Sequence, residues 1–308
     1  MILMYLAQQK HHFIMTSNSR RAFLKGRVPA TTHWARFYER LSQEFPEQLR
    51  PFALAAQGIE HGIFTPTQSN QVHAVFLLAQ HFEVQLGLVP TDLNTITAHP
   101  EPILWLDPVH LNRCEPIDDE GRFYIEPGVR MQQLVAAGLT QFSALPAQMM
   151  FIRWLADSAF HQHRSLESTG VQMASMVLAD CSVARLGPFG AQSSMALNSP
   201  RLQRMVPQLF QLLDTQIGQR CQALPVWPAR YRLDALQDQG RVNLAYFVLG
   251  QGLDLGWVEW VVLDSQSCTQ PSFKQQPTFG DEQKIWAQEL DAAVQQCFDP
   301  DGRFLSLL

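Results

Sequence analysis

Helix-spaced apolar positions and short apolar runs alternate along this chain, a pattern typical of a mixed α+β fold. The segments with helical spacing are 34–49, 65–79, 131–137, 202–213 and 281–297. The short runs that predict strands are 84–86, 103–106, 123–125, 173–178 and 182–186. The longest apolar run falls well short of the roughly 18 residues of a membrane helix.

The stretch 103–138 shows the pattern most clearly. Its first strand ends at Asp107-Pro108, and a polar turn over 118–121 leads to the second strand. Pro127-Gly128 then turns the chain into a short helix. We therefore expect one compact unit here, in which the two strands form a hairpin. By itself this unit contains no catalytic group.

Other segments are assigned by their local chemistry. Thr65-Pro66 predicts a helix start, with a capping hydroxyl followed by proline at the first helical position. His73 falls on the polar side of that helix, which indicates a solvated histidine. We interpret 51–64 as a connector and 149–164 as a loop. His161 and His163 are two residues apart in that loop, so they point to opposite sides and predict no shared metal.

Composition and charge fit an ordinary globular chain. The 308 residues are 46% hydrophobic and 17% charged, with a net charge of −5 and no basic block. Nucleic acid and anionic membranes are therefore not expected as main partners. The five cysteines are widely spaced and form no CxxC pair, which favours reduced thiols in a reducing compartment.

The segment 19–25, SRRAFLK, resembles a twin-arginine export signal. The residues that follow it are polar and include Pro29, whereas an export signal requires an apolar stretch at that point. We therefore expect a cytoplasmic protein with a basic amphipathic leader. Met15 is a second candidate for the first residue.

The central stretch also carries a family pattern of apolar positions, an acidic turn and a Pro-Gly-Val corner. The matching residues are Leu104, Leu106, Leu111, Ile125, Pro127, Gly128, Val129 and Leu134. The pattern resembles the FAD-binding domain of the p-cresol methylhydroxylase (PCMH) and vanillyl-alcohol oxidase flavoenzymes, the group that includes D-lactate dehydrogenases and glycolate oxidase subunits. The resemblance implies an α+β fold of two α/β subdomains, with an N-terminal helical extension and a short C-terminal helix.

Further blocks follow in the family's order. The segment 65–86 resembles the opening βαβ unit, and 177–187 resembles the motif VLADGsv..lG, with Cys181 in place of its glycine. The most specific block is 231–256, which matches Y.L..L and the family's glycine pattern at Gly250, Gly252, Leu255 and Gly256. The ending, 298–304, resembles fDP.grf. The implied domains are a leader and helix (1–58), an FAD-binding domain (59–265) and a C-terminal loop, helix and tail (266–308).

The resemblance implies where FAD would bind. In the family a glycine-rich turn after strand 84–86 holds the pyrophosphate with backbone N–H groups. Here Gly87 remains, Pro90 removes one donor and Asp92 adds a negative charge. No histidine or cysteine stands there for covalent attachment, so the implied FAD is non-covalent. A second glycine-rich loop has Ile152-Arg153 in place of its glycine pair.

The cofactor contacts that the resemblance assigns are Gly87, Val89, Pro90, Thr91, Pro146, Ser158, Gly250, Gly252, Leu255, Gly256 and Trp257. His161 and Arg164 are weaker candidates for holding an anion. No catalytic base is identified, because such residues often lie in the family's cap domain, for which 266–308 is too short. A partner subunit would then supply the cap or the electron acceptor.

Two functions remain open at this stage. The first is an FAD-linked oxidoreductase that oxidises a 2-hydroxy acid or a similar small organic substrate. The second is a degenerate, non-catalytic homologue that serves as a protein-interaction subunit. A serine hydrolase is a third and weaker alternative, because no G-x-S-x-G elbow is present. A Rossmann fingerprint is also missing, since 250–256 has one residue too many.

Overall fold

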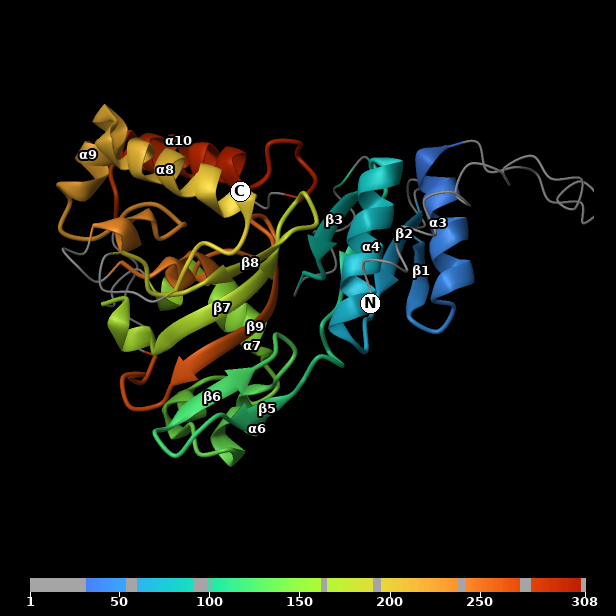
Figure 1. The fold of residues 1–308 in the computed structure, drawn as a ribbon, viewed down its shortest axis with the longest axis horizontal. Coiled ribbons are helices and arrows are strands. Elements are labelled where there is room, and N and C mark those ends of the chain that lie inside the picture. The colour runs from blue at the N-terminus through green and yellow to red at the C-terminus, as the bar shows by residue number, and fades with distance from the viewer. Residues whose placement is uncertain are drawn as a thin grey trace, which may run out of the picture.

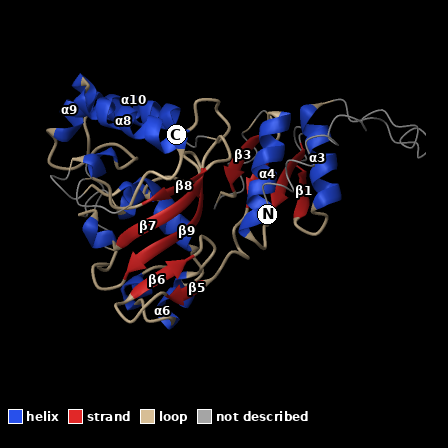
Figure 2. Ribbon diagram, viewed as in Figure 1, coloured by secondary structure: helices blue, strands red, loops and turns tan. Residues whose placement is uncertain are grey.

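The computed structural model of the chain describes residues 32–53, 60–90, 99, 101–161, 165–190, 195–237, 242–271 and 278–305. These residues form a mixed α+β fold built on two separate sheets (Figures 1 and 2). The expected α+β class is therefore confirmed. The twin-arginine-like segment and Met15 lie outside the described residues.

The first sheet has four strands in the order β1-β2-β4-β3. Strand β1 is antiparallel to β2, and the other neighbours are parallel. Helices α3 and α4 lie beside this sheet and contact each other (Figure 1). The elements are α3 (His33–Glu44), β1 (Leu49–Ala53), β2 (Glu60–Phe64), α4 (Ser69–Phe82), β3 (Gln85–Leu88) and β4 (Ile103–Leu106).

The second sheet has five antiparallel strands in the order β5-β6-β9-β7-β8. Its strands are β5 (Cys114–Pro116), β6 (Arg122–Ile125), β7 (Val171–Val177), β8 (Val183–Leu186) and β9 (Trp257–Asp264). Its helices are α6 (Met131–Ala136), α7 (Phe151–Ala156), α8 (Pro200–Asp214), α9 (Gln216–Gln222) and α10 (Asp281–Phe298). Short 3₁₀ turns are η1 (Thr140–Ala144), η2 (Ser158–Phe160), η3 (Glu167–Thr169), η4 (Leu233–Leu236) and η5 (Leu244–Val248). Helices α8, α9 and α10 pack together at one end (Figure 1).

The expected hairpin in the central stretch is wrong in its first arm. Strand β4 belongs to the first sheet, whereas β6 belongs to the second and pairs with β5. The Asp107 N–H donates to the Phe64 carbonyl oxygen at 2.9 Å, which fixes the end of β4 beside β2. The strand that pairs with β6 in a hairpin is β5, whose sequence Cys-Glu-Pro is not typical of a strand.

Three further expectations need correction. The segment taken as a connector contains β2 and the end of β1, and the segment taken as a loop contains α7. Helix α4 begins at Ser69 rather than at Thr65-Pro66. The Gln71 side chain caps this start, because its Oε1 accepts the N–H groups of Thr67 and Gln68 at 2.7 and 3.3 Å. The helices near 34–49, 131–137, 202–213 and 281–297 are confirmed, although α3 ends at Glu44.

Strand β4 is apolar on both faces because both faces are covered. Leu104 and Leu106 join the main hydrophobic core, whereas Ile103 and Trp105 form a second cluster with Leu305. Successive side chains of a strand point to opposite faces, so a strand covered on both sides reads as a continuous apolar run.

A C-terminal tail, 299–305, returns to the first sheet. Leu86 of β3 donates its N–H to the Arg303 carbonyl at 2.9 Å and accepts the Leu305 N–H at 2.8 Å. The buried Asp299 carboxylate accepts the N–H groups of Arg303 and Phe304. The Phe304 ring lies 5.5 Å from the Phe76 ring of α4. The tail therefore joins α10, which packs beside the second sheet, to the edge of the first.

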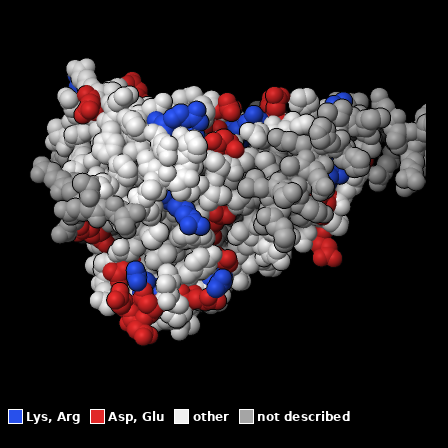
Figure 3. Space-filling model, viewed as in Figure 1, with Lys and Arg blue, Asp and Glu red and all other residues white. Residues whose placement is uncertain are grey.

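Charged side chains gather on the β5–β6 hairpin, at the bottom of Figure 3. They pair with one another: Arg122 contacts Asp118 and Glu120, and Arg113 contacts Glu115. Such exposed pairs contribute little to stability. We therefore interpret this patch as a solvated surface.

Candidate functional site

The segment 250–256, which carries the glycines of the most specific family-like block, is a tight and buried turn. Gly250 and Gly256 have φ angles of +82° and +155°, and Leu253 has φ +80°. A leucine rarely adopts such a conformation, which costs about 1–3 kcal/mol and persists only where its surroundings fix it. Here the Gln251 Oε1 accepts the Leu253 N–H at 3.0 Å.

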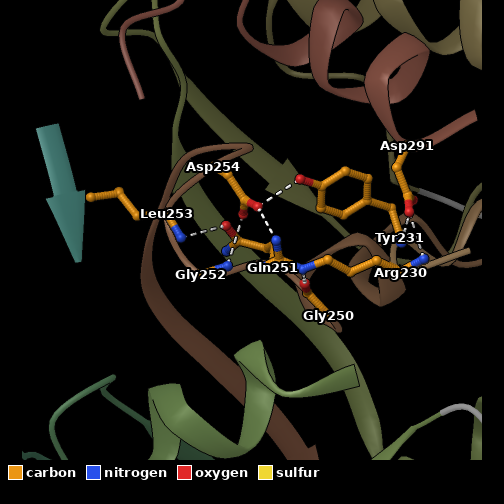
Figure 4. A network of polar contacts seen from close by, with 8 residues as sticks. All are labelled: Arg230, Tyr231, Gly250, Gln251, Gly252, Leu253, Asp254 and Asp291. Atoms are coloured by element: carbon orange, nitrogen blue, oxygen red, sulfur yellow. Dashed lines mark hydrogen bonds and ion pairs between the residues drawn. The ribbon is translucent and has the colours of Figure 1, made fainter. Parts of the chain in front are cut away.

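A buried carboxylate, Asp254, organises this turn (Figure 4). Its Oδ1 accepts the Gly252 N–H at 2.8 Å. Its Oδ2 accepts the Tyr231 hydroxyl at 2.6 Å and forms an ion pair with the Arg230 Nη1 at 2.7 Å. Arg230 also donates through Nε to the Gly250 carbonyl at 2.5 Å. The turn is therefore closed by its own carboxylate and by a neighbouring guanidinium.

Helix α10 is attached to the same network through Asp291. The carboxylate of this buried residue accepts the backbone N–H groups of Arg230 and Tyr231, each at 3.0 Å. Burial raises the pKa of Asp291 to about 6, although the two N–H donors act to lower it. Burial and the nearby Asp254 carboxylate also raise the pKa of Tyr231.

The raised pKa of Asp291 predicts a pH effect on stability. The folded chain binds the Asp291 proton more tightly than the unfolded chain, so this group's contribution to stability falls as pH rises from about 4 to 6. Asp291→Asn removes the titration. We expect the stability of the wild type relative to the variant to fall by about 1–3 kcal/mol between pH 4 and pH 7.

Urea unfolding of both proteins at the two pH values measures this change. The matched control is Asp281→Asn in the same helix, because the Asp281 side chain is 99% exposed. The prediction would be contradicted if the free energies of unfolding of wild type and Asp291→Asn changed by the same amount between the two pH values.

The short helix α7 contacts the turn 250–256 and the Pro-Gly corner. The Gly250 N–H donates to the Leu155 carbonyl at 2.7 Å. At its other end, α7 donates the Phe151 and Ile152 N–H groups to the carbonyls of Val129 and Pro127, at 2.7 and 2.9 Å. Blocks that are far apart in the sequence therefore meet around α7.

The family-like residues on the first sheet have mainly packing roles. A Cβ at Gly87 would lie 2.7 Å from the Trp105 ring, so the neighbouring strand requires glycine there. The Val89 N–H donates to the Leu106 carbonyl at 3.0 Å and is not free for a ligand. Pro90 is buried, and Thr91 lies outside the described residues.

The remaining predicted contacts are dispersed. Pro146 is exposed and its carbonyl accepts the Met149 N–H at 2.9 Å, while the Ser158 carbonyl accepts the His161 N–H at 2.9 Å. Leu255 is fully buried. A Cβ at Gly256 would lie 2.8 Å from the Val177 carbonyl, and Trp257 pairs with Val177 at the start of β9. Of the predicted residues, the structure brings Gly250 and Gly252 to α7.

The residues around the turn to which sequence reasoning gave no site role are Arg230, Tyr231, Asp254 and Asp291. Tyr231 entered only as the tyrosine of the family-like block. Asp291 had a detectable signal, because it shares a helix face with Ala287, Leu290 and Val294, all of which are buried. A carboxylate on an apolar helix face predicts a buried hydrogen-bonding partner. The Arg230–Asp254 pair had no comparable signal in the sequence.

The histidine candidates have structural partners. His73 is not the free surface histidine that was expected: its side chain is half-buried, and its Nε2 lies 2.7 Å from the Glu259 Oε1. The Ser175 hydroxyl donates to the other oxygen of Glu259 at 2.7 Å, so the carboxylate separates serine from histidine and no hydrolase triad forms. His161 is buried, and its Nε2 lies 2.7 Å from the Trp154 carbonyl. His163 and Arg164 lie outside the described residues.

The cysteines show no sign of activation. Burial raises the pKa of Cys114, Cys181 and Cys221 to about 11. In the described part of the chain, no cluster of histidine, cysteine and carboxylate side chains could hold a metal ion. No helix among the described residues is long and apolar enough to span a membrane.

Comparison with known proteins gives structural matches only. No family model matches the chain, and no curated protein matches it. A solved structure of Phl p 4, a glucose dehydrogenase, is 12% identical with a TM-score of 0.43, and the match covers 74% of this chain and 43% of that one. Alkyldihydroxyacetonephosphate synthase is 12% identical with a TM-score of 0.44, covering 77% and 41%.

A third match is glucooligosaccharide oxidase from Acremonium strictum, a protein with a 6-S-cysteinyl, 8α-N1-histidyl FAD. It is 13% identical with a TM-score of 0.37, and the match covers 66% of this chain and 34% of that one. This chain therefore spans less than half the length of the structures to which it is similar.

Proposed function

We propose that this chain is an FAD-binding, oxidoreductase-like protein that holds FAD without a covalent bond. The observation that carries the proposal is the convergence of family-like blocks around α7. The turn 250–256 donates to Leu155, and the Pro127-Gly128 corner accepts from Ile152. These blocks resemble the FAD-binding domain in sequence, and their meeting at one place is what a shared ligand requires.

The fit of these residues to FAD is partial. The Arg153 guanidinium of α7 forms no hydrogen bond or ion pair with the described residues. The buried Nε2 of Gln251 has no hydrogen-bond partner among them either. Phosphate and flavin oxygens accept such N–H groups. The N–H groups of Gly252 and Leu253 are already bound to the side chains of Asp254 and Gln251. Bound FAD would supply hydride transfer, and the chain's own residues would bind and orient it.

Further details of the function remain proposals. We propose a 2-hydroxy acid or a similar small organic molecule as the substrate. We also propose that a partner subunit provides the cap or the electron acceptor, and that the protein is cytoplasmic. The domain limits at 58 and 265 remain a prediction. Strand β1, before the first limit, pairs with β2, after it.

The closure of the turn by its own side chains favours a second candidate, a non-catalytic homologue that acts as a protein-interaction subunit. The Asp254 carboxylate and the Gln251 amide occupy backbone donors that a flavin would otherwise meet. The Arg230 guanidinium also holds the Gly250 carbonyl. Such a scaffold would keep its fold without a cofactor.

An absorbance spectrum of the purified protein, taken before and after incubation with excess FAD and desalting, distinguishes the two candidates. We expect flavin bands at close to one FAD per chain and a rise in the unfolding temperature with FAD concentration. Screening 2-hydroxy acids for bleaching of the flavin bands then tests the substrate. A colourless protein whose unfolding temperature does not respond to FAD would refute the first candidate.

A further inference from the structure

The guanidinium of Arg153 has no partner in the described part of the chain. It forms no hydrogen bond or ion pair there, although the side chain is half-buried. Burial lowers the pKa of Arg153, while the Asp107 carboxylate acts in the opposite direction. A partly desolvated guanidinium without a bonded acceptor is costly, and it is ready to bind an anion.

Backbone hydrogen bonds fix where Arg153 lies. Ile152, its neighbour in α7, donates to the Pro127 carbonyl, and the Gly128 N–H donates to the Leu111 carbonyl at 2.8 Å. A Cβ at Gly128 would lie 1.9 Å from the Pro108 carbonyl oxygen, so the corner touches the residues that directly follow β4. The helix that carries Arg153 is thereby held close to the segment that follows β4, of which Asp107 is the first residue.

This position is the carboxyl edge of the parallel part of the first sheet. Strands β2, β3 and β4 run parallel, so their carboxyl ends meet at one edge. Thr65 and Val89 follow β2 and β3 at this edge, as Asp107 follows β4. In open α/β sheets, ligands bind outside the carboxyl ends of the strands. Asp107 is the charged group that interacts electrostatically with Arg153 there.

We propose that Arg153 is a phosphate-binding residue, which takes a phosphoryl group of a nucleotide at the carboxyl edge of β2, β3 and β4. The guanidinium donates two parallel N–H groups to phosphate oxygens, a geometry that lysine cannot reproduce. The identity of the nucleotide as FAD rests on the proposed function, whereas phosphate binding by Arg153 does not. The phosphate chemistry is shared with ADP and free pyrophosphate, which the experiment separates.

The test is titration calorimetry of FAD, ADP, pyrophosphate and riboflavin with wild type, Arg153→Gln and Arg153→Lys. We expect Arg153→Gln to weaken FAD and ADP binding about 10- to 100-fold, with a smaller loss for Arg153→Lys. Binding of riboflavin, which has no phosphate, should change less than about twofold. The unfolding temperature of Arg153→Gln without ligand should not fall, since an unpaired charge is removed.

Arg204→Gln in α8 is the matched control, because Arg204 is exposed and its loss changes the net charge equally. Wild-type-like FAD affinity in Arg153→Gln would overturn the assignment and leave FAD binding intact. Arg153-dependent binding of ADP or pyrophosphate without FAD binding would support the assignment and refute the flavin proposal. A wild type that binds none of the three phosphate compounds would overturn the assignment.

Discussion

Replacing Asp254 with alanine is expected to lower the free energy of unfolding by about 3–5 kcal/mol. The substitution leaves Arg230 without its ion-pair partner, and the Arg230 side chain is only 20% exposed. It also removes the acceptor of the Tyr231 hydroxyl and of the Gly252 N–H. The loss of one buried partner costs the desolvation of the groups that remain, which is why the expected effect is large.

Urea unfolding followed by tryptophan fluorescence measures the effect. The control is Asp281→Ala, because this side chain is 99% exposed and we expect its loss to change stability by less than about 0.5 kcal/mol. The double variant Arg230→Met/Asp254→Leu removes both charges and should be more stable than Asp254→Ala. A decrease of under about 1 kcal/mol for Asp254→Ala would show that the network does not hold the turn.

Gly128→Ala is expected to destabilise the fold by more than about 3 kcal/mol. The added Cβ would lie 1.9 Å from the Pro108 carbonyl oxygen and 2.8 Å from that of Leu111. Both obstacles are backbone atoms, so the corner has to separate from the residues after β4. We expect α7 to lose its position as well, because it hydrogen-bonds to this corner.

Thermal unfolding of Gly128→Ala beside Gly138→Ala measures the steric part of this effect. Gly138 has φ +103° and nothing within 4 Å of its Cβ position, so alanine there meets conformational strain without a clash and should cost about 1–2 kcal/mol. Equal losses in the two variants would mean that the close approach at Gly128 is relieved at little cost.

Local patterns in the sequence predict individual elements of this fold better than they predict pairing. The apolar run of β4 and the helical spacing of α8 depend on nearby residues, and both are confirmed. The hairpin partner of β6 could not be predicted, because Cys114–Pro116 contains polar residues and a proline and resembles a loop. The antiparallel partner β9 lies far along the chain, and its register cannot be read from spacing.

The same limit applies to the candidate site. The glycines of 250–256 could be identified because their spacing is local. The contacts that close this turn come from Tyr231, 23 residues from Asp254, and from Asp291, 60 residues from Tyr231. In the sequence, Arg153, whose guanidinium has no bonded partner among the described residues, was visible only as a departure from the family's glycine pair. Its position at the strand ends required the structure.

The C-terminal tail has a consequence for the order of folding. Gln85 of β3 contacts Gly302 of the tail across a separation of 217 residues, and Leu86 bonds to the same segment. The edge of the first sheet therefore cannot be completed while the chain is growing, until the residues that form the second sheet have been made. Contacts so distant in sequence close slowly. An exposed β3 edge would make the unfinished chain prone to association with other chains.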